Sequence, residues 1–179
     1  ENTIIIRHDE RCCYEVSVAS VEIDQNGIEI GEFDNKKVYL KKGLFSSVLT
    51  KVNHWLKLAL DNAENETQKE MLKDLIEHYR TGSIEMHEKF SEKWVNDKKM
   101  TVEMHHGFIE SYRDPAGLRC EFEGYVSVVN KKECECLHEY VRNSAKILSL
   151  LPYPKEYERK TFNLPSYDAI DFLTICSSS

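Results

Sequence analysis

A four-residue turn in the middle of the chain, Asp114-Pro115-Ala116-Gly117, places the strongest constraint on how this sequence can fold. Asp at the first position, Pro at the second and Gly at the fourth are the residues that a type I turn favours. The segment before the turn alternates between two sets of side chains, which is the pattern of a β-strand with two different faces. The sequence therefore predicts a β-hairpin over residues 104–129.

Alternation along the first strand of this hairpin assigns its side chains to faces. It places Glu110 and Tyr112 on one face with His106 and Phe108, while Ser111 points to the other face. A carboxylate and a phenol that point the same way, two residues apart, can bind a cation and donate a hydrogen bond. The hairpin is therefore the first place to look for a functional site.

The same residues also fit an ordinary strand surface. Glu110 would then form an ion pair with Arg113 or Arg119, and the phenol would cover one face of a sheet. On the return strand, Glu121 and Glu123 share a face and would stabilise the hairpin through the same arginines. Spacing alone leaves both interpretations open.

Outside the hairpin, the apolar pattern predicts helices and strands in separate blocks. Apolar residues recurring at intervals of three and four predict helices over residues 44–63, 68–80 and 84–95. The second helix is expected to begin at a capping box, Thr67-Gln68-Lys69-Glu70, and a fourth to run from Asn130 to Pro152. Strands are expected at residues 14–23, 38–40 and 169–175. Blocks of strands and helices without βαβ alternation favour an α+β fold.

Composition excludes several classes of protein. The chain has 24 Lys and Arg against 31 Asp and Glu, a net charge of −7, and no basic stripe, so nucleic acid is not an expected partner. No apolar run approaches the roughly 18 residues of a membrane span, and no secretion signal is present. The six cysteines follow no repeated spacing, which favours reduced thiols in a soluble, cytoplasmic protein.

Two clusters of possible metal ligands do not have the required geometry. His105 and His106 are neighbours on a strand and point to opposite faces. Cys134 and His138 share one face of the predicted helix, but Cys136 lies on the far side and no fourth ligand is near in sequence. We expect no metal site within this chain.

The stretch GFIESYRDP at residues 107–115, followed by EFEG at 121–124, closely resembles a segment of the dipeptidyl peptidase III family of zinc metallopeptidases. The resemblance continues upstream through Thr81-Gly82-Ser83-Ile84-Glu85 and downstream through Val128-Val129-Asn130-Lys131. It covers nearly the whole chain. It implies a zinc exopeptidase with two lobes, which removes dipeptides from the N-termini of short peptides.

This resemblance also implies roles for individual residues. Glu110 would hold the N-terminal ammonium of the substrate, and Tyr112 would donate its hydroxyl to the scissile carbonyl oxygen as negative charge develops there. Ser111 and Glu123 would belong to the substrate-binding set. The mechanism implied is attack by a zinc-activated water on the second peptide bond.

The zinc-binding patterns of the family are absent from the sequence. Its members carry H-E-x-x-G-H on one helix and an E-E-C-R-A-E-like run on a later one, whereas His87-Glu88 and His138-Glu139 are not followed by a second His one helical turn on. We therefore expect an internal fragment of a longer enzyme, inactive alone, with zinc held by the rest of the polypeptide.

By analogy with the family, the chain divides into three parts. Residues 1–129 would form a small antiparallel, barrel-like β core with flanking amphipathic helices in the lower lobe. Residues 130–168 would be a helix and connection reaching toward the zinc lobe, and residues 169–179 a truncated return strand of the core. A truncated paralogue that binds peptides or a protein partner without catalysis is the alternative.

Overall fold

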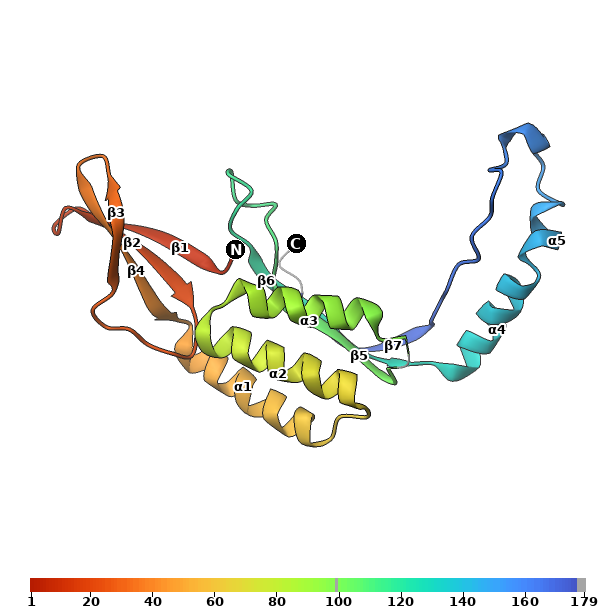
Figure 1. Ribbon diagram of the computed structural model, residues 1–179, viewed down its shortest axis with the longest axis horizontal. Coiled ribbons are helices and arrows are strands. Elements are labelled where there is room, and N and C mark those ends of the chain that lie inside the picture. Colours follow the sequence, from red (N-terminus) through yellow and green to blue (C-terminus); the bar gives the residue numbers. More distant parts are fainter. Residues whose placement is uncertain (99, 177–179) are drawn as a thin grey trace.

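The computed structural model describes residues 1–98 and 100–176 of the chain (Figure 1). Its strands are β1 (Thr3–His8), β2 (Cys13–Ala19), β3 (Ile28–Phe33), β4 (Lys36–Leu44), β5 (Val102–Glu110), β6 (Glu121–Val129) and β7 (Ile170–Cys176). Its helices are α1 (Ser46–Asp61), α2 (Glu66–Thr81), α3 (Ile84–Asn96), α4 (Lys131–Arg142) and α5 (Ser144–Leu148), with a 3₁₀ turn at Lys155–Tyr157. Helices and strands occur in blocks, and the predicted α+β class is confirmed.

The described strands form two separate sheets. The first has the order β1-β2-β4-β3, and the second has the order β5-β6-β7. Every described strand pair is antiparallel except β2 with β4, which run parallel because the hairpin partner of β4 is the outer strand β3. The expectation of an antiparallel core therefore holds for the second sheet, whereas the first is mixed.

The sequence pattern missed two strands of the first sheet and shortened a third. Strand β1 contains Ile4-Ile5-Ile6, and a continuous apolar run has no alternation to reveal a strand. Every residue of strand β3 is exposed, so neither face of this strand is buried and burial does not specify its register. The turn before it was predicted: the Asp24 carboxylate accepts hydrogen bonds from the backbone N–H groups of Asn26 (3.1 Å) and Gly27 (3.2 Å).

The N-cap of helix α2 is Asn65, two residues before Thr67, where the sequence predicts the capping box. The Asn65 side chain accepts a hydrogen bond from the Gln68 backbone N–H (2.8 Å), and the Gln68 side chain accepts one from the Glu64 N–H (2.7 Å). The arrangement is similar to the predicted capping box, shifted along the chain because Asn is as good an N-cap as Thr, but Gln68 binds the N–H of the residue before the N-cap. The next helix, α3, starts after Ser83, whose side chain makes no capping hydrogen bond.

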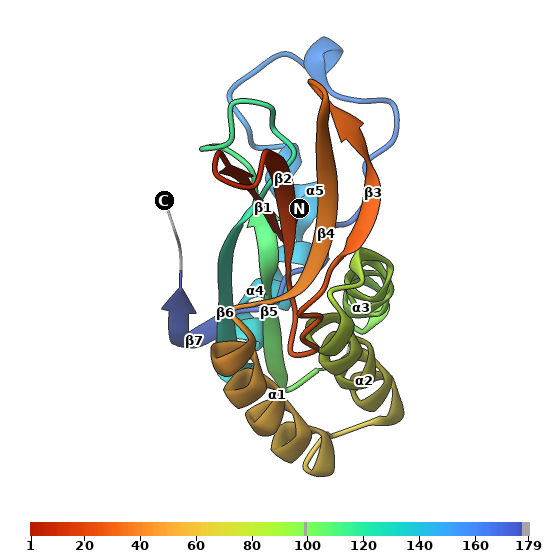
Figure 2. The same cartoon turned by 90° about the vertical axis from the view of Figure 1, so that its left-hand side faces the viewer.

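Helix α4 starts where the sequence predicts but ends earlier. Asn130 caps it by accepting a hydrogen bond from the Glu133 N–H (3.1 Å). The helix stops at Asn143, whose side chain bonds back to the Glu139 carbonyl, and α5 follows as a separate short helix. Together with the chain that returns to β7, these helices form an arm over residues 130–168 that extends away from the rest of the molecule (Figure 1). In the view of Figure 2 the arm lies behind strands β1 to β4.

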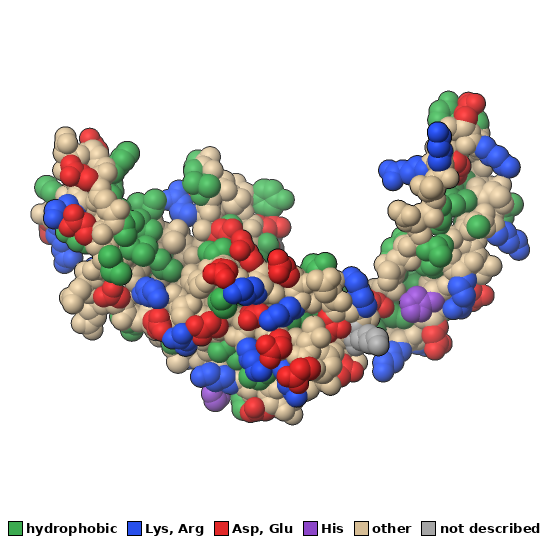
Figure 3. Space-filling view, viewed as in Figure 1, with side chains coloured by type: hydrophobic (Ala, Val, Ile, Leu, Met, Phe, Trp, Pro, Cys, Tyr) green, Lys and Arg blue, Asp and Glu red, His purple; other side chains and the backbone are tan. Residues whose placement is uncertain are grey.

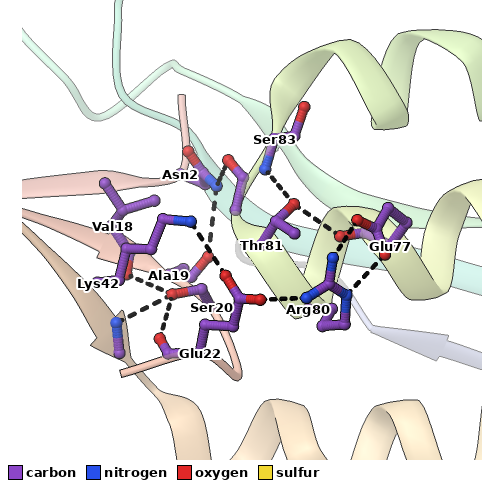
Figure 4. Close-up of polar contacts among 12 residues, drawn as sticks. Asn2, Val18, Ala19, Ser20, Glu22, Lys42, Glu77, Arg80, Thr81 and Ser83 are labelled. Carbon is purple, nitrogen blue, oxygen red and sulfur yellow. Dashed lines mark hydrogen bonds and ion pairs between the residues drawn. The ribbon is translucent and has the colours of Figure 1, made fainter. Parts of the chain in front are cut away.

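Polar contacts join the first sheet to the end of α2 (Figure 4). The buried Asn2 side chain donates a hydrogen bond to the Gly82 carbonyl (3.0 Å). The Arg80 guanidinium pairs with both Glu77 and Glu22, and Lys42 pairs with Glu22 (3.1 Å). Carbonyl groups at the end of α2, which have no partner inside the helix, thus bind the chain that leaves β2.

The main core lies between the three helices α1 to α3 and one face of the second sheet. Its buried members include Leu75, Tyr79, Phe90 and Phe108, with Phe122 packed beside them. The outer faces of α2 and α3 carry acidic and basic side chains in mixed array (Figure 3). The helices therefore have one apolar and one charged side, as their sequence periodicity predicts.

Four of the seven histidines gather where α2 and α3 meet β5. The rings of His78 and His87 lie 4.9 Å apart and those of His87 and His105 lie 5.7 Å apart, while His106 accepts or donates a hydrogen bond at 2.8 Å with the Tyr79 hydroxyl. His78 is 1% exposed and donates through Nδ1 to the Ser83 carbonyl (2.8 Å).

Burial keeps these histidines neutral. It lowers the pKa of His78, His105 and His106 to about 4, and it lowers the pKa of His87 as well. Repulsion from neighbouring histidines lowers the pKa of His78, His105 and His106 further. At His87 the hydrogen bond to the His106 carbonyl, and then the carboxylates of Glu1 and Glu88, oppose the effect of burial on the pKa. The helical layer and the second sheet are therefore held together through uncharged imidazoles.

This arrangement predicts acid sensitivity. Between about pH 6.5 and pH 4 the unfolded chain binds protons at these histidines and the folded chain does not, so the free energy of unfolding falls as the pH falls through that window. We expect His78→Asn, which keeps a donor toward the Ser83 carbonyl, to flatten the dependence of Tm on pH. The exposed His54→Asn variant is the matched control, and equal slopes in both variants contradict the prediction.

Candidate functional site

The tip of the β5–β6 hairpin is organised by Asp114. The Gly117 N–H donates to the Asp114 carbonyl (2.9 Å), which closes the predicted four-residue turn, and Gly117 has a φ of 65° that suits glycine. The Asp114 carboxylate accepts hydrogen bonds from the backbone N–H groups of Leu118 (2.8 Å) and Arg119 (3.0 Å). It also pairs with the Arg119 guanidinium. These contacts hold the pKa of Asp114 well below its usual range.

A β-bulge changes which face of the hairpin carries Glu110. Phe108 pairs with Phe122 and Glu110 pairs with Glu121, so Ile109 is an extra residue without a partner. Cross-strand partners point to the same face, which puts Glu110 on the face opposite to Phe108. The prediction that Glu110 shares a face with His106 and Phe108 is wrong, because an inserted residue reverses the alternation that the prediction assumed.

The bulge brings three carboxylates to one face of the second sheet. Glu110 and Glu121 are directly paired, and Glu123 lies two residues further along the same side of β6. Burial raises the pKa of Glu123, and repulsion from Glu110 and then Glu121 raises it further. This face therefore has an excess of negative charge, which a bound cation would relieve.

The two arginines of the hairpin do not neutralise Glu110. Arg113 pairs with Glu121 (3.2 Å), and Arg119 pairs with Asp114. Within residues 1–98 and 100–176, the Glu110 carboxylate has no hydrogen bond or ion pair. The alternative interpretation, in which Glu110 is half of a structural ion pair with one of these arginines, is therefore not what the structure shows.

Tyr112 lies outside the strand on which the sequence placed it. Strand β5 ends at Glu110, and Tyr112 occupies a turn in which the Asp114 N–H donates to the Ser111 carbonyl (3.1 Å). Its side chain is 86% exposed. The phenol is thus exposed to solvent on a short, hydrogen-bonded turn that follows β5.

A shallow pocket of about 380 Å³ adjoins this acidic face. Glu123 is its one carboxylate, and the other lining residues are His105, Ile109, Gly124, Tyr125, Phe172, Ile175 and Cys176. Phe172 packs edge-on against Tyr125 with ring centroids 5.5 Å apart. No pattern in the sequence predicts that β7 contributes to the site, because only the pairing of β6 with β7 brings Phe172 and Ile175 beside Glu123.

Metal ligands do not come together in the described parts of the chain. No group of three or more His, Cys, Asp or Glu side chains there has an arrangement that could hold a metal ion. Cys134 is buried and accepts a hydrogen bond from the Ala169 backbone N–H (3.2 Å), which links helix α4 to the chain just before β7. The residues present therefore do not fit a zinc ion.

Among the described residues, the helices are too short or too polar to cross a membrane.

We predict that Asp114→Ala disorders the hairpin tip. The carboxylate holds the N–H groups of Leu118 and Arg119, and its removal leaves both without a partner. Hydrogen exchange at these two amides should become faster by an order of magnitude or more, while exchange in α2 stays unchanged. The exposed turn residue Asp34, substituted in the same way, is the control. Unchanged exchange at the tip contradicts the role assigned to Asp114.

Comparison with known proteins agrees with the family resemblance of the sequence. A protein named Dipeptidyl peptidase 3 from Dictyostelium discoideum is 40% identical over 82% of this chain and 21% of its own length. The human protein of that name is 38% identical over 92% of this chain and 24% of its own length. The chain thus spans between a fifth and a quarter of these curated relatives.

The fold has matching solved structures as well. DPP III from Caldithrix abyssi has a TM-score of 0.59 and 21% identity, and it covers 89% of this chain and 30% of its own. A dipeptidyl-peptidase III from Corallococcus has a TM-score of 0.52. The sequence model of peptidase family M49 matches residues 1–179. The chain therefore belongs to peptidase family M49.

Proposed function

We propose that this chain is the substrate-binding portion of a dipeptidyl peptidase III-like exopeptidase, which releases dipeptides from peptide N-termini. The observation that carries the proposal is the unpaired carboxylate of Glu110 beside Glu121 and Glu123. A free N-terminal ammonium is the cation that distinguishes the end of a peptide from its interior, and a carboxylate fixed on a strand can bind it through charged hydrogen bonds.

Glu110 is the proposed ammonium ligand because its charge has no other partner. Arg113 leaves Glu121 only partly available, and the raised pKa of Glu123 favours its neutral form relative to an ordinary Glu. Arrival of an ammonium group would lower the pKa of Glu123 again, because a nearby positive charge favours the carboxylate. Glu123 would then assist Glu110, and Ser111 would line the approach.

Tyr112 is the proposed hydrogen-bond donor to the carbonyl oxygen that becomes negatively charged in the reaction. A phenol is neutral at working pH and donates one hydrogen bond from a rigid ring. Its turn begins immediately after Glu110. One short segment would therefore carry both the carboxylate that binds the N-terminal ammonium and the phenol that stabilises the transition state.

The metal chemistry of such an enzyme is proposed to lie outside this chain. Zinc and the residues that hold it would come from the rest of the longer polypeptide, so the chain alone would neither retain zinc nor cleave peptides. The arm at residues 130–168 supports this placement: Cys134 is its only buried residue, and large apolar side chains such as Tyr140, Leu150 and Leu164 are exposed on it. Figure 3 shows hydrophobic side chains along the arm. We propose that the arm packs against the zinc lobe of the same polypeptide, while residues 1–129 and 169–179 form the lower lobe.

A cytoplasmic location is part of the proposal. All six cysteines are free, and two of them, Cys12 and Cys13, are adjacent without being bonded to each other. Free thiols at exposed positions are typical of a reducing compartment.

Glu110→Gln in the intact parent protein tests the ammonium site. The charge meets the ammonium in both the ground state and the transition state, so we expect KM for free-amine peptides to rise by roughly 10- to 100-fold with a smaller change in kcat. Discrimination against N-acetylated peptides should weaken as well. Glu121→Gln is the matched control, since its partner is Arg113. An unchanged KM in the Glu110 variant contradicts the proposal that Glu110 binds the substrate ammonium.

Tyr112→Phe tests the oxyanion role in the same protein. The hydroxyl would meet charge that exists only in the transition state, so kcat should fall by roughly 100-fold with little change in KM. Circular dichroism should show an unchanged fold, because the side chain is exposed. Near-native kcat in this variant means that Tyr112 takes no part in the chemistry, and a rise in KM alone assigns it to binding.

A further inference from the structure

Two consecutive turns at the tip of the β5–β6 hairpin share one residue, Asp114. Its N–H donates to the Ser111 carbonyl (3.1 Å) and closes the first turn, and its carbonyl accepts from the Gly117 N–H (2.9 Å) and closes the second. Tyr112 occupies the middle of the first turn. Both backbone hydrogen-bonding groups of Asp114 are therefore used in shaping the tip.

The side chain of Asp114 joins these turns to the start of β6. One carboxylate oxygen accepts hydrogen bonds from the N–H groups of Leu118 (2.8 Å) and Arg119 (3.0 Å), and the other binds the Arg119 guanidinium. The side chain is only 6% exposed, although it lies at the tip of an exposed hairpin. Hydrogen bonds to a charged acceptor are strong, so this carboxylate fixes the chain on both sides of the tip.

Tyr112 has no comparable support of its own. Its side chain is 86% exposed, and within the described residues it takes part in no hydrogen bond or ring contact. The position of the phenol therefore depends on the backbone of its turn. Besides Asp114, that turn is linked to β6 by the ion pair of Arg113 with Glu121 (3.2 Å), in which Arg113 is 69% exposed and solvent screens the charges.

Glu110 is held in a different way. It is the last residue of β5 and pairs with Glu121 across the strand ladder. Loss of the Asp114 carboxylate would therefore loosen the turn that carries Tyr112 and leave the strand that carries Glu110 in place. Two groups of the proposed site, only two residues apart, depend on different supports.

We propose that Asp114 is a positioning residue for Tyr112. The inference rests on the proposed function, in which the Tyr112 hydroxyl donates to the carbonyl oxygen that becomes negatively charged. Asp114 contacts no substrate atom and acts only by holding the turn. A donor stabilises a transition state when it is already aimed at the developing charge, and a displacement of about 1 Å can lower the rate by roughly 100-fold.

Steady-state kinetics of Asp114→Ala in the intact parent protein tests the proposal. We expect kcat to fall by roughly tenfold and KM to change by less than about twofold, because Glu110 keeps its place in the strand. Asp114→Asn should have an intermediate kcat, since one amide oxygen can still accept from the N–H groups of Leu118 and Arg119. Asp34→Ala, in the exposed turn between β3 and β4, is the matched control and should keep both parameters.

A double-mutant cycle separates positioning from a general loss of structure. If Asp114 acts through the Tyr112 hydroxyl, Asp114→Ala should lower kcat little further once Tyr112→Phe has removed that hydroxyl. Independent, multiplicative losses of kcat overturn the proposal. A native kcat in Asp114→Ala, or a change in KM alone, overturns it as well.

The same measurements distinguish failure of this inference from failure of the proposed function. Near-native kcat in Tyr112→Phe means that there is no oxyanion donor to position, and both proposals are then wrong. A slow Tyr112→Phe variant beside a native-rate Asp114→Ala variant keeps the proposed role of Tyr112 and rejects only the role of Asp114.

Discussion

The contact between helix α3 and strand β5 is the constraint on which the rest of the structure depends. A side chain at Gly107 would place its Cβ only 2.3 Å from the His87 ring, so helix and strand approach closely only because this residue is glycine. His87 contacts the His106 carbonyl in the same place (3.3 Å), and Tyr79 of α2 bonds to the His106 ring. The hairpin that carries the candidate site is thereby fixed to the helical layer.

This attachment of the hairpin to the helices explains how an exposed hairpin can hold the side chains of the candidate site in fixed positions. One face of β5 and β6 is buried through Phe108 and Phe122, whose rings lie 5.6 Å apart, and it supplies the packing. The opposite face carries the acidic side chains, which need water or a cation near them. Burial on one side thus holds carboxylates in place on the other, although they repel one another.

Charge is distributed unevenly over the molecule, and the proposals depend on that distribution. The helices carry balanced pairs such as Lys93 with Asp74 and Lys89 with Glu85. The hairpin face, in contrast, has an excess of carboxylates. Balanced surfaces contribute little to recognition, whereas the acidic face of the hairpin would attract a ligand of opposite sign.

The sequence alone determined the features that depend on neighbours along the chain. The turn at Asp114-Pro115-Ala116-Gly117, the cap at Asn130 and the apolar faces of α1 to α3 follow from local backbone preferences and periodicity, and the structure has each of them. The family was also readable from the residues around Glu110, because a long run of matching residues does not arise by chance.

Only the tertiary structure decided which side chains meet. The bulge at Ile109 moved Glu110 to the face of Glu121 and Glu123, and the pairing of β6 with β7 brought Phe172 and Ile175 beside Glu123. Whether Arg113 would neutralise Glu110 was likewise open until the fold paired it with Glu121. The physical reason is the same in each case: strand register and ion pairing are set by contacts between distant segments, and no local pattern in the sequence encodes them.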